Sequence, residues 1–217
     1  MDSGLFISLE GTDGCGKSTQ IPLMQAFFAD KGYPVHVLRE PGGTVIGEKI
    51  RDVILDTAHT AMAPVTEILL YAAARAQIMQ EKILPALQAN HVVICDRFLD
   101  SSLAYQGAGR NLDLDVILQI NTSALCGILP HITFFLDIPP ETAMERRTAA
   151  GKPDRIEKEG LAFQKKVYHG YQALAARYPK RIVTIDATKS IDAIFAQIKE
   201  RLEPAVKQLK ERNGYSE

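Results

Sequence analysis

The stretch that most constrains the fold of this 217-residue chain runs from residue 5 to residue 20. An apolar run, Leu5 to Leu9, predicts a buried strand, and a helix is expected from about Lys17. Between them the sequence fits G-x-x-x-x-G-K-[ST] at every fixed position. In such a loop, glycines let successive backbone N–H groups point at one anion, and the following helix adds its positive end. The order of strand, loop and helix therefore predicts a nucleotide phosphate site.

Each position of this loop has an expected task. Lys17 is expected to reach the β- and γ-phosphates of ATP, and the Ser18 hydroxyl to bind Mg²⁺. A glycine-rich turn with an incidental Lys-Ser pair is the alternative, and the neighbouring strand and helix argue against it. The predicted ATP-binding residues are Gly11, Thr12, Asp13, Gly14, Cys15, Gly16, Lys17, Ser18 and Thr19.

Composition narrows the class of protein. Apolar residues make up 46% and charged residues 24% of the chain, as in ordinary soluble proteins. A formal net charge of −1 argues against a nucleic-acid polymer as partner, and no apolar run is long enough for a membrane span. Cys15, Cys95 and Cys126 are too far apart in sequence to indicate a disulfide framework or a zinc site. We therefore expect a cytoplasmic protein.

Strand and helix patterns alternate along the chain, which predicts a parallel sheet covered by helices on both faces. The expected fold is α/β, with a five-stranded parallel sheet of the P-loop type in a single domain, 1–217, and a site at the carboxyl ends of the strands. The expected strands are 5–9, 35–39, 92–95, 132–137 and 182–185. The expected helices begin near 17, 46, 64, 113, 140 and 191, with another ending near 177, and the helix from 64 is expected to continue to 88.

Two aspartates end apolar strands, and each is a candidate magnesium ligand. Asp96 follows VVIC and Asp137 follows FFL, so periodicity alone does not distinguish them. Asp137 has a competing role as the cap of the helix that follows it. Arg97 directly after Asp96 favours Asp96, because the pair supplies a metal ligand and a phosphate-binding cation at one strand end.

A basic segment with glycine and proline, about 146–156, predicts a lid that closes over the phosphates. An ordinary exposed loop is the alternative. On the expected helix from 64, Tyr71 and Arg75 lie four residues apart and hence on one face. Such a pair can stack on a base and bond to its edge, although a core tyrosine beside a surface arginine is the more common arrangement.

Together these residues resemble the thymidylate kinases, P-loop enzymes that convert dTMP to dTDP with ATP. The resemblance runs from Phe6 to about Phe163 and is carried by five segments. These are EGTDGCGKST (10–19), REPGGT (39–44), LLYAAAR (69–75), DRFLDSSLAYQG (96–107) and PDRIE (153–157). The phosphate loop is shared with many nucleotide-binding proteins, whereas the second and fourth segments together are far more specific.

The resemblance implies roles for individual residues, ATP with Mg²⁺ as the donor, and a homodimer. Arg51 and Arg97 would bind the dTMP phosphate, Tyr71 would stack on thymine, and Arg75 would bond to its carbonyl edge. The implied dTMP-binding residues are Asp13, Arg39, Glu40, Arg51, Tyr71, Arg75, Arg97, Ser101, Ser102, Tyr105 and Gln106. The implied catalytic residues are Lys17, Arg97, Arg147 and Arg155, and the implied metal ligands are Ser18 and Asp96.

One departure affects the expected source of catalytic charge. Some thymidylate kinases carry an arginine in the phosphate loop, where this chain has Gly14 and Cys15. The sequence resembles the bacterial subgroup in which lid arginines act instead, and these would be Arg147 and Arg155. No general base is expected, because the acceptor is a phosphate that is mostly dianionic at neutral pH.

Two alternatives stay open. A kinase for another monophosphate, such as dUMP, dCMP or AMP, would share the phosphate loop and the cations. A nucleotide-binding switch that hydrolyses ATP or GTP slowly would lack an acceptor pocket. The guanine-reading tetrad N-K-x-D does not occur in the sequence.

Overall fold

Five parallel strands form one sheet in the order β2-β3-β1-β4-β5. The computed structural model describes residues 4–148 and 153–212. The strands are β1 (Leu5–Glu10), β2 (Val35–Arg39), β3 (Val92–Asp96), β4 (Ile132–Asp137) and β5 (Ile182–Asp186). The predicted fold class and all five predicted strands are confirmed, with shifts of at most one residue at their ends.

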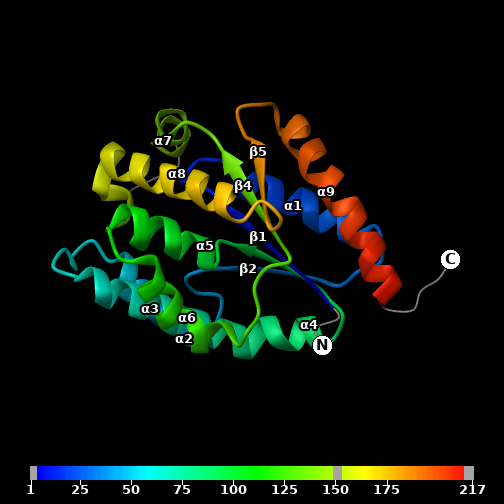
Figure 1. Cartoon of the computed structure of the whole chain (residues 1–217), viewed down its shortest axis with the longest axis horizontal. Helices are drawn as coiled ribbons and strands as arrows, with labels where there is room; N and C mark the ends of the chain where they lie inside the picture. The colour runs from blue at the N-terminus through cyan, green and yellow to red at the C-terminus, as the bar shows by residue number, and fades with distance from the viewer. Residues whose placement is uncertain (1–3, 149–152, 213–217) are drawn as a thin grey trace.

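Helical segments connect the strands and cover the sheet (Figure 1). They are α1 (Lys17–Ala29), α2 (Val45–Leu55), α3 (Pro64–Ile78), η1 (Met79–Ile83), α4 (Leu84–Gln88), α5 (Leu99–Ser102), η2 (Leu103–Gly109), α6 (Leu114–Leu125), α7 (Pro140–Thr148), η3 (Glu157–Glu159), α8 (Gly160–Arg177) and α9 (Ile191–Arg212). No helix within 4–148 or 153–212 has the length and apolar character that a bilayer span requires.

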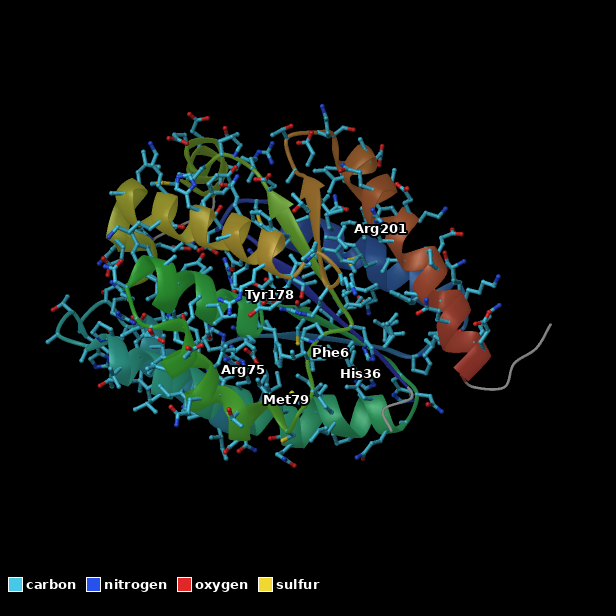
Figure 2. The ribbon with its side chains drawn as sticks, in the orientation of Figure 1. Phe6, His36, Arg75, Met79, Tyr178 and Arg201 are labelled. Carbon is cyan, nitrogen blue, oxygen red and sulfur yellow. The ribbon has the colours of Figure 1, made fainter. Side chains whose placement is uncertain are left out.

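The sheet separates two hydrophobic cores. On one face α1 and α9 pack together and cover the alternate side chains Leu5, Ile7 and Leu9 of β1. On the other face lies the core that contains Phe6 and Met79, both labelled in Figure 2. Because β1 is buried on both faces, its apolar run is nearly continuous instead of alternating.

The register brings the carboxyl ends of the strands to one edge of the sheet. Leu9 pairs with Asp96, Arg39 pairs with Asp96 from the other side, and Asp137 pairs with Asp186. The loops after β1, β2 and β3 therefore leave the sheet side by side, which positions the site.

The segment from Leu99 to Gly109 is helical, although no helix was predicted there. It consists of α5 and the π-helical η2, and it is almost completely buried. Gly107 and Gly109 weaken the helical pattern in the sequence, since glycine has a low helix propensity. In the structure a Cβ on Gly109 would lie 2.7 Å from the Phe163 ring of α8, so the glycine allows this close approach.

The predicted helix 64–88 is continuous but changes its winding at η1, where the chain becomes π-helical. The centre of the predicted lid, residues 149–152, lies outside the described residues. Its flanks are the end of α7 and the segment from Pro153 to Glu159.

We predict that Phe134→Ala lowers the free energy of unfolding by about 3–5 kcal/mol. Phe134 is fully buried at the centre of β4, so its truncation leaves a cavity between the sheet and the α1/α9 layer. Urea unfolding followed by circular dichroism measures the change. The matched control is Val45→Ala at a side chain that is 81% exposed, which should change the stability by less than about 0.5 kcal/mol.

Candidate active site

The phosphate loop joins β1 to α1 and has the backbone that an anion site needs. Gly14 and Gly16 have positive φ angles of 86° and 105°, and a Cβ on Gly14 would clash with the carbonyl of Ala143. No acidic residue occupies the first turn of α1, so nothing there offsets the positive helix end. The Lys17 ammonium lies 3.4 Å from the Gly11 carbonyl oxygen and 3.5 Å from that of Thr12, folded back over the loop.

A cavity of about 710 Å³ opens beside this loop. Loop residues 13–19 line it together with side chains from β2, α2, β3 and α7. Those side chains are Arg39, Glu40, Arg51, Asp96, Arg97, Arg146 and Arg147. The volume suits a nucleotide-sized ligand. Gly11 and Thr12 lie behind the cavity surface as buried parts of the loop.

The same cavity extends to residues that the sequence analysis did not identify. Gln20 of α1 and the segment 189–191 between β5 and α9 line it. Gln20 donates a hydrogen bond to the Ile191 carbonyl at 3.1 Å, which joins the two elements. The segment 189–191 carries no recognisable motif. Its contribution follows only from the fold, because α9 packs against α1, the helix that follows the phosphate loop.

Asp96 and Ser18 fit a magnesium site. Both line the cavity, and the Oδ1 atom of Asp96 is buried with no hydrogen-bond partner among the described residues. A buried carboxylate oxygen without a partner is costly unless a ligand completes it. Asp137 also has a buried Oδ1 atom without a hydrogen bond, but it is not one of the residues lining this cavity.

Arg97 lines both this cavity and a second, smaller one. Its backbone adopts the left-handed conformation, φ 71°, directly after β3. Its guanidinium donates to Asp13 Oδ1 at 2.7 Å and lies 5.0 Å from the centre of the Tyr105 ring. Burial opposes ionisation of Asp13, but the charges of Arg97 and Lys17 outweigh it and lower its pKa to about 2. The ion pair is therefore fully charged at neutral pH.

A second, narrower cavity of about 80 Å³ lies beyond Arg97. Its wall includes Tyr71, Phe98, Ser101, Tyr105 and Gln106, so an aromatic ring, hydroxyls and an amide face one space. Apolar side chains complete the wall, namely Pro41, Leu55 and Ile156. An aromatic and apolar cavity with a few polar groups is typical of a site for a flat heterocycle.

Arg75 forms the base of this second cavity and is almost fully buried (Figure 2). It forms an ion pair with Glu40 at 2.6 Å and donates to Asn121 Oδ1 at 2.5 Å. Both Nη atoms donate to the Ser102 hydroxyl at 3.2 Å. Glu40 and Asn121 take the other three N–H groups, so a further acceptor would have to replace one of the two Ser102 contacts. We expected Ser102 on the cavity wall, but it is not a lining residue and contacts Arg75 instead.

Asn121 was not identified from the sequence, yet it fixes the orientation of Arg75. Its amide group donates to the Ile117 carbonyl at 2.9 Å, so its oxygen faces the guanidinium. The signal available in the sequence was a polar residue among the apolar positions of the helix 114–125. A buried asparagine on such a face needs a specific partner.

Two further arginines, Arg51 and Arg39, line the larger cavity. Arg51 lines both cavities and donates to the Pro41 carbonyl at 2.9 Å. Arg39 lines the larger cavity and pairs with Glu48 at 2.8 Å on the surface. Glu48 also accepts from the Gly43 backbone at 2.7 Å, which ties the 39–44 loop to α2.

The two predicted lid arginines have different surroundings. Arg147 lines the larger cavity and donates twice to Glu157, at 2.7 and 2.9 Å. Arg155 is buried, donates to the Ile54 carbonyl at 2.7 Å, and pairs with Glu67 at 2.7 Å. The structure thus brings Arg147 to the phosphate loop and does not bring Arg155 there.

Comparisons with known proteins agree on one family. The sequence model described as thymidylate kinase matches residues 9–198. The thymidylate kinase of Exiguobacterium sp. strain AT1b is 48% identical over 196 residues, which are 90% of this chain and 92% of that protein. That of Caldanaerobacter subterraneus is 46% identical over 94% of this chain and 97% of that protein. The crystal structure of thymidylate kinase from Ehrlichia chaffeensis matches with a TM-score of 0.76 and 29% identity, over 92% of this chain and 98% of that one.

Glu10, the last residue of β1, titrates in an unusual range. Its carboxylate is buried and accepts from the Phe98 backbone at 2.7 Å and from the Ser101 hydroxyl at 2.5 Å. Burial, followed by the nearby charge of Asp100, raises its pKa from 4.5 to about 7 despite these bonds. The folded protein therefore binds this proton more tightly than the unfolded chain does.

We predict that the stability from the Glu10 proton is complete below pH 4.5 and is lost as the pH rises through about 7. The loss amounts to up to about 3 kcal/mol, from the size of the pKa shift. Urea unfolding at pH 5, 6, 7 and 8 measures it, and Glu10→Gln should flatten that part of the profile. The control Glu48→Gln, at a surface carboxylate, should keep the slope. An unchanged slope in Glu10→Gln would show that another group causes it.

Proposed function

The chain belongs to the thymidylate kinase family, and we propose that it transfers the γ-phosphoryl group of ATP to dTMP to form dTDP, a step in dTTP synthesis. The observation that carries the proposal is that two cavities meet at Arg97. One cavity contains the phosphate loop, and the other contains an aromatic base pocket. A nucleotide switch needs only the first.

ATP occupies the larger cavity in this proposal. The amides of the phosphate loop and the ammonium of Lys17 bind the β- and γ-phosphates. Gln20 and the 189–191 segment at the far end of the same cavity bound the rest of the nucleotide.

A magnesium ion would be held by Ser18 and Asp96, with phosphate oxygens and water as its other ligands. No group of three or more His, Cys, Asp or Glu side chains suited to a metal occurs among the described residues. This agrees with magnesium, which is bound by one or two protein oxygens and otherwise by phosphate and water. When bound, the ion would neutralise charge on the transferring phosphate.

The thymine of dTMP enters the smaller cavity, stacked against Tyr71. Arg75 has only donor groups, so the base edge that faces it must present an acceptor. The O4 carbonyl of thymine or uracil meets this requirement, whereas the amino group of cytosine would place donor against donor. Gln106 contributes to the same wall, and Tyr105 lies beside Asp13 at the expected position of the sugar.

Transfer requires two anions to approach each other, and the cations around the larger cavity reduce that repulsion. Arg97 and Arg51 bind the dTMP phosphate, while Lys17 and Arg147 hold the phosphates of ATP. We assign Arg155 a supporting part in this arrangement, because its guanidinium is committed to Glu67. Reaching the phosphates would require that buried pair to break.

The decisive experiment is ADP formation from Mg²⁺-ATP with dTMP, dUMP, dCMP, dGMP or AMP, beside a control without acceptor. We expect dTMP to be used at least tenfold better than dCMP, because cytosine leaves buried donors unpaired. Preference for a purine monophosphate would contradict the base-pocket assignment. Equal ADP formation without acceptor would contradict the kinase proposal and favour the nucleotide switch.

A homodimer is the assembly that the surface favours. Helix α3 packs against both α2 and α6, and this three-helix surface exposes the large apolar residues Val53, Val65, Leu69 and Val116. Exposed large apolar side chains on helices that pack together support a subunit contact at this surface.

We also propose that the protein is cytoplasmic. The thiols of Cys15 and Cys95 are buried and form no disulfide, which supports a reducing compartment as the location.

We predict that Leu69→Glu converts the dimer to a monomer in sedimentation-velocity experiments. The side chain of Leu69 is about half exposed in the single chain, so the charge is tolerated in the monomer but not in an apolar contact. Ile191→Glu, at a similarly exposed side chain outside this surface, is the control for oligomeric state. A wild-type protein that sediments as a monomer would contradict the proposal.

A further inference from the structure

The Arg97 guanidinium donates a hydrogen bond to a residue that the sequence analysis did not identify, Tyr171. Tyr171 belongs to α8, the long helix that follows the lid segment. Its hydroxyl lies 3.1 Å from Arg97 Nη1, 2.8 Å from Ser101 Oγ and 2.9 Å from Glu10 Oε2. One phenol therefore touches the cation, the helix start after β3, and the strand that leads into the phosphate loop.

The direction of these hydrogen bonds follows from the number of donors and acceptors. The two hydroxyls have two protons for three close contacts, so when Glu10 is ionised at least one of them donates to Oε2, and the other donates there or to the neighbouring hydroxyl. Burial, together with the charge of Glu10, raises the pKa of Tyr171, which keeps its hydroxyl proton in place. Each hydroxyl oxygen keeps a lone pair that accepts from Arg97 Nη1.

The ring of Tyr171 is fixed as firmly as its hydroxyl. It stacks on Phe135 of β4 with centroids 5.2 Å apart and meets the edge of Tyr105 at 6.3 Å. The side chain is only 2% exposed, so no alternative rotamer faces solvent. A hydroxyl attached to such a ring has a defined position, unlike one on a surface side chain.

The two terminal nitrogens of the Arg97 guanidinium thus have different surroundings. Nη1 is bound by Tyr171 and Ser101, whereas Nη2 faces Asp13 and the cavity. The Arg97 side chain is only 14% exposed, with the centre of the Tyr105 ring 5.0 Å from its guanidinium carbon. The orientation of the guanidinium toward a phosphate in the cavity therefore depends on the hydrogen bonds at Nη1.

We propose that Tyr171, oriented by Glu10, is a positioning residue that aims Arg97 at the reacting phosphate. The inference rests on the proposed function, because it assumes that Arg97 meets the phosphate of dTMP. Tyr171 itself touches no substrate. Its effect is on the geometry of phosphoryl transfer, where small displacements of a cation reduce the rate strongly.

The test is Tyr171→Phe, which removes one oxygen and keeps the ring. At pH 8, above the Glu10 pKa of about 7, we expect kcat for dTMP to fall about tenfold while the KM for ATP changes less than twofold. The matched control is Tyr168→Phe on the same helix, whose hydroxyl bonds to Gln172 and not to Arg97. It should keep the wild-type kcat.

A double-mutant cycle with Arg97→Lys separates positioning from general stability. Lysine lacks the guanidinium Nη1, so adding Tyr171→Phe to that variant should lower kcat by less than a further twofold. A tenfold loss in both backgrounds, or no loss in wild type, would overturn the proposal. Wild-type protein without dTMP-dependent turnover would instead contradict the proposed function, which the same assay measures first.

Discussion

The hydrogen bond from the Arg97 backbone N–H to the Leu9 carbonyl, at 3.0 Å, joins the two chain segments on which the site depends. Leu9 is one residue before the end of β1, and Arg97 is the first residue beyond β3. Because β1 and β3 are adjacent and parallel, the phosphate loop and the Arg97 turn emerge from the sheet together. A change in that register would move Arg97, Asp96 and the phosphate loop relative to one another.

The basic side chains near the two cavities have different partners, and their partners indicate different roles. Arg75 and Arg155 are buried and committed to Glu40 and Glu67. Lys17 and Arg97 line the larger cavity, where Lys17 contacts backbone carbonyls of the phosphate loop and Arg97 pairs with Asp13. Arg75 and Arg155 therefore stabilise the shape of the pockets, whereas Lys17 and Arg97 line the cavity that an anion would enter.

Much of this arrangement was predictable from sequence, since local patterns carried it. The phosphate loop, the strand ends and the Tyr71/Arg75 spacing are all short-range features, and the sheet follows from alternating apolar segments. Tyr171 and Asn121 were not predictable in this way. Each is defined by a contact across more than 40 residues, and neither belongs to a motif.

The helix 99–109 was missed for a related reason. Its glycines lower the intrinsic helix propensity, but tight packing against α8 outweighs that cost. The placement of Arg155 likewise depends on tertiary structure, because its partner Glu67 lies 88 residues earlier. Sequence patterns identified a charged segment there without indicating which charge would be neutralised.

Glu67 joins the segment after residue 152 to the wall of the second cavity. This single carboxylate accepts from Gln106 at 2.9 Å and from Arg110 at 3.2 and 3.3 Å, and it pairs with Arg155. Burial opposes its ionisation, but these donors outweigh burial and keep its pKa below the usual value. The segment after residue 152 therefore cannot be replaced freely by the corresponding segment of a relative. The replacement would need an arginine that reaches Glu67. Without it, this buried carboxylate beside the second cavity would lose one of its donors.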